Sequence, residues 1–295
     1  MEGKITTIQR LSIHDGPGIR STIFMKGCNL RCQWCHNPET FSMQPQLQWI
    51  SEKCINCGKC VEVCNDSAFT INNGLVQFNR DKCTTCFDCV EHCYPNAIQQ
   101  IGRTISADDL FNEIAPDFPY FNTSNGGVTF SGGEPMLQLN FLLKTLQLFK
   151  QANIHTAIET NFTADWSKYE AIIPYVDLFI GDLKIMDSKD HKRWTGLGND
   201  IILKNIKKLD KTGIPYYIRT PIIPGVNHSA IQVESIIQFV SDLNNVERFE
   251  LLPYHPLADV KYRNLGIKNP LQNTKGLTNK DLEIYNPILK QYNPG

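Results

Sequence analysis

Three cysteines in one short segment are the residues of this chain with the most specific chemistry. Cys28, Cys32 and Cys35 lie in the segment Gly27-Cys-Asn-Leu-Arg-Cys-Gln-Trp-Cys-His-Asn-Pro38 and have the spacing C-x3-C-x2-C. Electron-transfer [4Fe-4S] clusters are normally bound by four cysteines. Three thiolates on one loop would leave one iron of such a cluster without a protein ligand. The spacing therefore predicts an open cluster whose fourth ligand comes from outside the chain.

A structural zinc loop or part of a disulfide framework is the alternative interpretation of this triplet. Zinc sites usually combine a C-x2-C pair with a second pair of ligands elsewhere in the chain. The sequence supplies no fourth ligand at that spacing. We therefore favour the open iron–sulfur cluster over zinc.

The other eight cysteines form two identical runs with the spacing C-x2-C-x2-C-x3-C. In bacterial two-cluster ferredoxins the fourth cysteine of each such run binds the other cluster. Two zinc knuckles are the alternative, but two identical four-cysteine runs favour the ferredoxin arrangement. The pattern predicts two further [4Fe-4S] clusters, the first bound by Cys54, Cys57, Cys60 and Cys93 and the second by Cys83, Cys86, Cys89 and Cys64.

Composition restricts the class of protein. The chain has 295 residues and a net charge of −1, so it offers no electrostatic basis for binding nucleic acid or an anionic membrane. Its first residues do not resemble a signal peptide, and no apolar run approaches the length that spans a membrane. Eleven cysteines in such a chain favour metal ligation over disulfides. We expect a cytoplasmic, oxygen-sensitive protein of anaerobic metabolism.

The elements that position these residues alternate between strands and helices. Strands are expected at 19–26, 127–130, 154–159, 178–183, 216–220 and 249–253, and helices at 107–114, 139–151, 166–173, 201–211, 230–242 and 280–290. This alternation implies an α/β fold with a parallel sheet and right-handed crossovers. About six βα units fall short of a complete eight-fold barrel. Functional side chains should then lie at the carboxyl ends of the strands.

A change in composition near Gln48 marks a domain boundary. From there to about Gln100 the chain is polar and rich in cysteine. We therefore predict a core formed by residues 1–47 and 101–295, with a ferredoxin-like insertion at 48–100 that binds two clusters.

Two motifs lie at predicted strand ends. The stretch Ser131-Gly-Gly-Glu-Pro135 follows the strand at 127–130, where two glycines permit a tight bend and a close approach of the backbone to a small ligand. An ordinary strand-to-helix turn is the alternative. Asp182 and Lys184 are two residues apart at another strand end, so their side chains share one side. An ordinary salt bridge explains that pair equally well.

Several segments together resemble the glycyl-radical-enzyme activating enzymes, relatives of the pyruvate formate-lyase activase in the radical S-adenosylmethionine (SAM) superfamily. The resemblance rests on His14-Asp-Gly-Pro-Gly-Ile-Arg20, on Lys26-Gly-Cys28 and on Cys35-His-Asn-Pro-Glu-Thr40. It extends from about residue 8 to about residue 262. It implies a partial (β/α)6 TIM-type barrel as the radical SAM core, which agrees with the count of βα units.

The resemblance also implies which residues bind cofactors. The cluster at Cys28, Cys32 and Cys35 would be catalytic, with SAM on its open iron. Further SAM contacts are implied for Trp34, His36, Asn37, Gly132, Gly133, Glu134, Asp182, Lys184, Arg219 and His255. A monovalent cation, Na⁺ or K⁺, would lie beside SAM on Glu159, Thr160 and Asp182, with Glu159 where the family has Asp.

The activity implied by the resemblance is that of an oxidoreductase. The enzyme would cleave SAM reductively to a 5′-deoxyadenosyl radical, which abstracts a hydrogen atom from a glycine of a partner glycyl radical enzyme. Its cofactors would be three [4Fe-4S] clusters and SAM, and its reductant a flavodoxin or ferredoxin. Two alternatives remain: a radical SAM enzyme acting on a peptide or small metabolite, and an iron–sulfur electron-transfer protein without catalytic activity.

Overall fold

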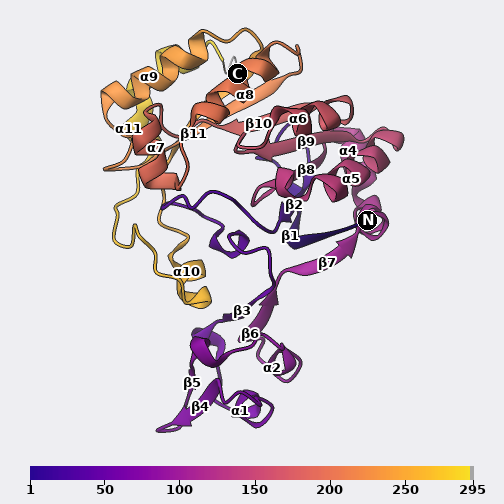
Figure 1. The fold of residues 1–295 in the computed structure, drawn as a ribbon, viewed down its shortest axis with the longest axis vertical. Coiled ribbons are helices and arrows are strands. Elements are labelled where there is room, and N and C mark those ends of the chain that lie inside the picture. The colour runs from indigo at the N-terminus through magenta and orange to yellow at the C-terminus, as the bar shows by residue number, and fades with distance from the viewer. Residues whose placement is uncertain (293–295) are drawn as a thin grey trace.

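An eight-stranded sheet forms the centre of the computed structural model, which describes residues 1–292 (Figure 1). The strand order is β12-β11-β10-β9-β8-β2-β1-β7. Six neighbouring strands are parallel, namely β2 (Arg20–Met25), β8 (Gly127–Gly132), β9 (His155–Thr160), β10 (Leu178–Asp182), β11 (Tyr216–Ile222) and β12 (Val246–Pro253). Two antiparallel strands, β1 (Glu2–Ser12) and β7 (Arg103–Ser106), extend the sheet beside β2. The predicted partial barrel is confirmed.

Helices lie between the strands along the chain, and each has buried side chains. They are α3 (Ala107–Ile114), α4 (Phe118–Ser124), α5 (Leu139–Gln151), α6 (Trp166–Ile172), α7 (Ser188–Thr195), α8 (Asp200–Asp210) and α9 (Ala230–Ser241). In α5 the buried side chains Leu142, Leu146 and Phe149 recur every three to four residues, which is the period of one helix face. Phe149 packs edge-on against Phe130 of β8, and both are fully buried. This core fixes the carboxyl ends of the strands relative to one another.

The insertion extends away from the sheet as a small module of its own (Figure 1). Its base is an antiparallel pair, β3 (Gln46–Trp49) and β6 (Ile98–Ile101), and its far end is the hairpin β4 (Phe69–Asn72) and β5 (Leu75–Phe78). Each cysteine run contributes its third member to a one-turn helix: Cys60 lies on α1 (Lys59–Glu62) and Cys89 on α2 (Asp88–Glu91), and both are buried. The two halves of the module therefore repeat the same local structure.

A short helix near the C-terminus lies between the core and the insertion. Figure 1 shows α10 (Asp259–Leu265) next to β3 and β6, and it packs against β3 and against the 3-10 turn η1 (Pro38–Thr40). The guanidinium of Arg80 in the insertion donates to the carbonyls of Leu47 and Asn264. The insertion is thus attached to the core through α10 as well as through its own ends.

The predicted strands and helices begin and end within three residues of the observed ones, apart from the last helix. The single helix expected at 280–290 is wrong. That segment forms α11 (Asn279–Leu282), the 3-10 turn η7 (Glu283–Tyr285) and α12 (Asn286–Leu289). Pro287 lacks the N–H that would continue a helix from η7.

Two further points concern the limits of the chain. The end of the predicted core, residues 293–295, lies outside the described residues. Within residues 1–292 no helix is long and apolar enough to cross a membrane.

Candidate functional site

A cavity of about 290 Å³ lies where the cysteine loop meets the carboxyl ends of the parallel strands. Cys28, Cys32 and Cys35 line one side of it. The ends of β8, β9 and β10 contribute polar groups to the other side, and the segments after β11 and β12 close it with apolar ones. The volume falls near the lower end of the range for small-molecule sites.

Neighbouring loops hold the cysteine loop in place through its backbone. The amide of Arg31 donates to the carbonyl of Thr195 at 2.7 Å, and the amide of Gln33 to that of Trp194 at 3.1 Å. Two amide groups approach the sulfur atoms directly. The side chain of Asn161 donates to Cys28 Sγ at 3.9 Å, and the backbone N–H of Asn37 to Cys35 Sγ at 3.4 Å.

Burial controls the protonation of these thiols. It raises the pKa of Cys28 and Cys35, and it raises the pKa of Cys32 to about 12. Such thiols keep their protons at neutral pH unless a metal displaces them, and a coordinating thiol is deprotonated outright. Half-buried thiols that line one cavity and lose their protons only to a metal fit a bound cluster.

The positions of the acidic, histidine and cysteine side chains bear on the alternative that a single zinc ion binds here. In residues 1–292 no group of three or more of them converges closely enough to bind a single metal ion. Each cysteine of a [4Fe-4S] cluster binds a different iron, so its ligands need not converge on one point. Three cysteines along one side of a cavity are the donor set that such a cluster would use.

Gly132 and Gly133 allow the end of β8 to approach the cysteine loop closely. Gly132 has φ +95°, and a Cβ on it would lie 2.7 Å from the Cα of Phe24. A Cβ on Gly133 would lie 2.0 Å from the carbonyl oxygen of Gly27. The amide of Gly133 donates to the carbonyl of Met25 at 2.9 Å. Both glycines line the cavity. A side chain on Gly132 would push β8 away from β2, and one on Gly133 would push it away from the cysteine loop.

Glu134 points away from the cavity. It is fully buried, and its carboxylate accepts hydrogen bonds from the amide of Met136 at 3.0 Å, the amide of Asn161 at 2.8 Å and the hydroxyl of Thr160 at 2.9 Å. Burial raises its pKa to about 7 against the effect of these donors. Glu134 therefore joins the ends of β8 and β9, whereas Ser131, Gly132 and Gly133 of the same motif line the cavity.

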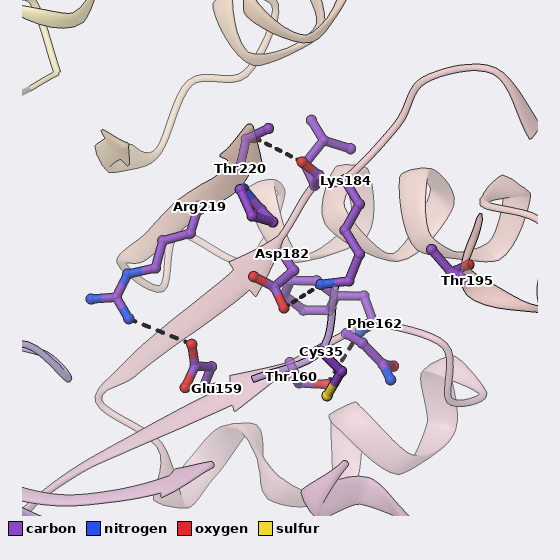
Figure 2. A network of polar contacts seen from close by, with 12 residues as sticks. Cys35, Glu159, Thr160, Phe162, Asp182, Lys184, Thr195, Arg219 and Thr220 are labelled. Carbon is purple, nitrogen blue, oxygen red and sulfur yellow. Dashed lines mark hydrogen bonds and ion pairs between the residues drawn. The ribbon is translucent and has the colours of Figure 1, made fainter. Parts of the chain in front are cut away.

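Asp182 and Lys184 form an ion pair at the end of β10, with 2.5 Å between Lys184 Nζ and Asp182 Oδ2 (Figure 2). Both line the cavity. Burial opposes the charge on Lys184, but Asp182 and the neighbouring Cys32 outweigh it and raise its pKa. The salt bridge and the cavity position expected for this pair are both present, and they place a cation beside the thiols.

Arg219 approaches the site from β11 without lining the cavity. Its guanidinium contacts Glu250 at 3.0 Å and Glu159 at 3.5 Å, as Figure 2 shows for Glu159, and it donates to the carbonyl of His14. Glu159 lines the cavity and accepts a hydrogen bond from Ser131. Burial raises the pKa of Glu159, and the charge of Arg219 acts in the opposite direction. Arg219 of β11 thus forms ion pairs with residues of both β9 and β12.

Most of the residues expected to bind cofactors line the cavity. It is lined by Trp34, His36, Asn37, Gly132, Gly133, Glu159, Thr160, Asp182, Lys184 and His255 in addition to the three cysteines. His36 and His255 face one another, with ring centroids 4.3 Å apart. Glu134 and Arg219 are the two expected residues that do not line it.

Sequence reasoning missed several residues of the cavity wall. Asn161 and Ser131 are polar, and the others are mainly apolar: Leu30, Pro221, Ile223, Leu252, Pro253 and Tyr254. Asn161 directly follows the Glu159-Thr160 strand end, and Tyr254 directly precedes His255. Position next to a strand-end motif is the signal that could have identified them.

The cysteines of the insertion line two separate cavities. Cys54, Cys57, Cys60 and Cys93 line one of them, together with Trp49. Cys64, Cys83, Cys86 and Cys89 line the other, together with Leu47. Each group combines three cysteines of one run with the fourth of the other, which is the division that the spacing predicts.

Comparisons with known proteins place the chain in a family. The pattern of the radical SAM superfamily matches residues 87–236, and that of the 4Fe-4S dicluster domain matches residues 43–94. The chain is 37% identical to the (2S)-3-sulfopropanediol dehydratase activating enzyme of Klebsiella oxytoca, over 98% of this chain and 93% of the relative. It is 42% identical to the trans-4-hydroxy-L-proline dehydratase activating enzyme of Clostridioides difficile, over 89% of this chain and 87% of the relative.

A solved structure shares the fold at lower identity. The crystal structure of Streptococcus suis SuiB bound to precursor peptide SuiA aligns with a TM-score of 0.54 and 16% identity, over 90% of this chain and 44% of that one. At this identity the similarity concerns the fold alone.

Proposed function

The chain belongs to the glycyl-radical-enzyme activating enzymes of the radical SAM superfamily, and we propose that Cys28, Cys32 and Cys35 bind its catalytic [4Fe-4S] cluster. When bound, the reduced cluster supplies the electron that cleaves SAM to methionine and the 5′-deoxyadenosyl radical that takes a hydrogen atom from a glycine of the partner enzyme. The observation that carries the assignment is that the three half-buried thiols line one cavity with the ends of three parallel strands. The chain is thus an oxidoreductase with iron–sulfur clusters and SAM as cofactors.

The residues opposite the thiols are proposed to bind and orient SAM. Lys184 offers a buried cation to the SAM carboxylate, and Asp182 holds the Lys184 side chain in position. The backbone of Gly132 and Gly133 is accessible from the cavity because neither carries a side chain. The apolar wall of Ile223, Leu252 and Tyr254 excludes water from the space beside the loop. The family's reaction requires such a wall because the radical must be kept from competing reactions.

Four other predicted SAM residues take supporting or lining roles in this proposal. His36 and His255 form an aromatic edge of the cavity. Arg219 acts through Glu159, whose position it fixes. Glu134 acts through the backbone of Asn161, which in turn carries the amide beside Cys28.

A monovalent cation, Na⁺ or K⁺, completes the proposed site beside Glu159, Thr160 and Asp182. The three residues line the same cavity, and oxygen ligands suit such hard cations. Arg219 and Lys184 already pair with the two carboxylates, so we expect weak binding. Rates of SAM cleavage in KCl and NaCl compared with a bulky organic cation test it.

The insertion is proposed to bind the second and third [4Fe-4S] clusters. Its division from the core, at residues 48–100 against 1–47 and 101–295, is proposed from the cysteine distribution and agrees with the position of the β3–β6 pair. We propose a flavodoxin or ferredoxin as reductant, because low-potential clusters exchange single electrons. The proposed setting is an anaerobic cytoplasm.

The partner is a glycyl radical enzyme, and the named relatives define the first candidates for its identity. They activate a (2S)-3-sulfopropanediol dehydratase and a trans-4-hydroxy-L-proline dehydratase, respectively. We propose that the partner of this chain belongs to the same group of lyases and dehydratases.

Anaerobic reconstitution with iron and sulfide tests these assignments. The reduced protein should convert SAM to 5′-deoxyadenosine and produce a glycine-centred electron paramagnetic resonance (EPR) signal on a partner of the group named above. Cys32→Ala should abolish both activities and remove about one third of the bound iron, while the paired variant Cys57→Ala should leave SAM binding intact. Zinc in the triplet, or full activity of Cys32→Ala, would refute the assignment.

A further inference from the structure

Four buried side-chain atoms have no hydrogen-bond partner within residues 1–292. They are Glu39 Oε2, Trp49 Nε1, Tyr262 OH and Asn264 Oδ1. All four belong to η1, β3 or α10, the segments that meet between the core and the insertion. A buried donor without an acceptor costs about 1–3 kcal/mol, so each one in a folded protein requires an explanation. Tyr262 and Trp49 are the two donors.

Tyr262 lies on a helix that packs against the segment directly after the cysteine loop. Tyr262 is only 3% exposed and lies on α10, which packs against η1 just after the loop. The preceding residue, Lys261, contacts Asn37 at 2.8 Å and Glu39 at 2.6 Å. The backbone of Asn37 in turn donates to Cys35 Sγ. One turn of α10 is therefore fastened to the residues that follow Cys35.

The cysteines of the loop bear on the protonation of Tyr262. Burial raises the pKa of the Tyr262 hydroxyl, and negative charge on Cys35 and then on Cys32, which a bound metal would create, would raise that pKa further. Glu39 Oε2 also lacks a partner, so the tyrosine and this carboxylate oxygen do not satisfy one another. Asn264 Oδ1 on the same helix lacks a partner as well, so it does not accept from the hydroxyl either. The sulfur atoms of the proposed cluster would offer the hydroxyl a further acceptor.

We propose that the Tyr262 hydroxyl donates a hydrogen bond to a sulfur of the catalytic cluster, either a cysteine thiolate or a sulfide, and thereby sets its reduction potential. The inference rests on the proposed assignment of Cys28, Cys32 and Cys35. Hydrogen bonds to the sulfurs and the second shell of ligands tune cluster potentials. A donor stabilises the more negative, reduced cluster and so raises the potential.

The same helix connects this donor to the insertion. Arg80 of the insertion donates to the carbonyl of Asn264, two residues after Tyr262, and Arg263 forms an ion pair with Glu52 at 2.8 Å. A raised potential makes the catalytic cluster a better acceptor for an electron from the insertion. Through Tyr262, the attachment of the insertion can therefore influence the reduction potential of the catalytic cluster.

Redox titration of Tyr262→Phe tests this inference. The fully loaded variant is titrated anaerobically, and the catalytic cluster is followed through the part of the EPR signal that changes when SAM is added. At a fixed ambient potential we expect the reduced-to-oxidised ratio to fall about tenfold, a shift of about 59 mV to lower potential for a one-electron couple. Trp49→Phe is the matched control, since it removes the other buried donor beside Cys54 and Cys57 and should leave this potential unchanged.

An unchanged potential in a fully loaded Tyr262→Phe protein would overturn the inference. A shift of equal size in Trp49→Phe would overturn it too, because the effect would then not be specific to Tyr262. Should Tyr262→Phe fail to load, 3-fluorotyrosine introduced at position 262 decides. Its more acidic hydroxyl is a stronger donor and should raise the potential of the SAM-responsive cluster, and an unchanged potential in the loaded protein refutes the bond. If the wild type contains no SAM-responsive cluster at all, the proposed function fails instead.

Discussion

Replacing Glu134 by glutamine removes a buried carboxyl whose ionisation should influence stability near neutral pH. Burial raises the pKa of Glu134 from 4.5 to about 7, although three donors face its two oxygens. A carboxyl whose pKa is higher in the folded state than in the unfolded state binds its proton more tightly when folded. Its contribution to stability is therefore complete below pH 4.5 and is lost as the pH rises through about 7.

The size of the effect follows from the shift. A rise of about 2.5 pKa units corresponds to about 3 kcal/mol in the difference between the fully protonated and fully ionised limits. Between pH 5.5 and 7.5 the same two pKa values give a loss of about 2 kcal/mol. A glutamine amide does not titrate, so the Glu134→Gln variant lacks this component while keeping every other titrating group of the protein.

Urea unfolding of the cluster-loaded proteins under anaerobic conditions measures the difference. The free energy of unfolding of the wild type minus that of Glu134→Gln should decrease by about 2 kcal/mol from pH 5.5 to 7.5. Glu170→Gln, at an exposed carboxylate of α6, is the control and should give a nearly constant difference. Parallel pH profiles for wild type and Glu134→Gln would refute the reasoning and would mean that the three donors keep Glu134 ionised.

Three further changes address the site and the attachment of the insertion. Lys184→Met removes the cation from the cavity and leaves Asp182 unpaired. The Kd for SAM, measured by anaerobic equilibrium dialysis, should therefore rise at least about tenfold, which corresponds to about 1.4 kcal/mol. An unchanged Kd would exclude binding of the SAM carboxylate by Lys184. Asn161→Ala removes the amide that contacts Cys28 Sγ and should slow single-turnover SAM cleavage by about tenfold, since hydrogen bonds to charged groups contribute about 1.5–3 kcal/mol. Arg80→Ala removes the two hydrogen bonds to Leu47 and Asn264; hydrogen exchange in β3 and α10 should increase, and SAM cleavage driven by a protein reductant should fall severalfold while dithionite-driven turnover is unaffected. Unchanged or slower exchange, or equal loss with both reductants, would contradict that prediction.

Features set by local sequence could be predicted. The parallel strands and most of their helices follow from short-range periodicity, and the ferredoxin spacing alone predicts which cysteines share a cavity. Asp182 and Lys184 were expected on one side because they are two residues apart on an extended segment.

Features set by long-range contacts could not be predicted. The glycine-rich motif does not show whether Glu134 faces a ligand or the protein, because its direction depends on Thr160 and Asn161 on the next strand. Arg219 approaches the carbonyl of His14, more than two hundred residues earlier, across the inside of the barrel. The antiparallel strand β1 and the edge strand β7 were missed because their pairing partners, rather than strong alternation of their own, define them.

The paired base of the insertion has a consequence for how such proteins change over evolution. Gln46 and Ile101 are opposite one another in the β3–β6 ladder, so the chain leaves the barrel and returns to it at points about 5 Å apart. A segment with coincident ends can be acquired, exchanged or deleted by a single recombination event while every barrel strand keeps its neighbours. The number of accessory clusters in a lineage can therefore change while the barrel and its cysteine loop stay the same.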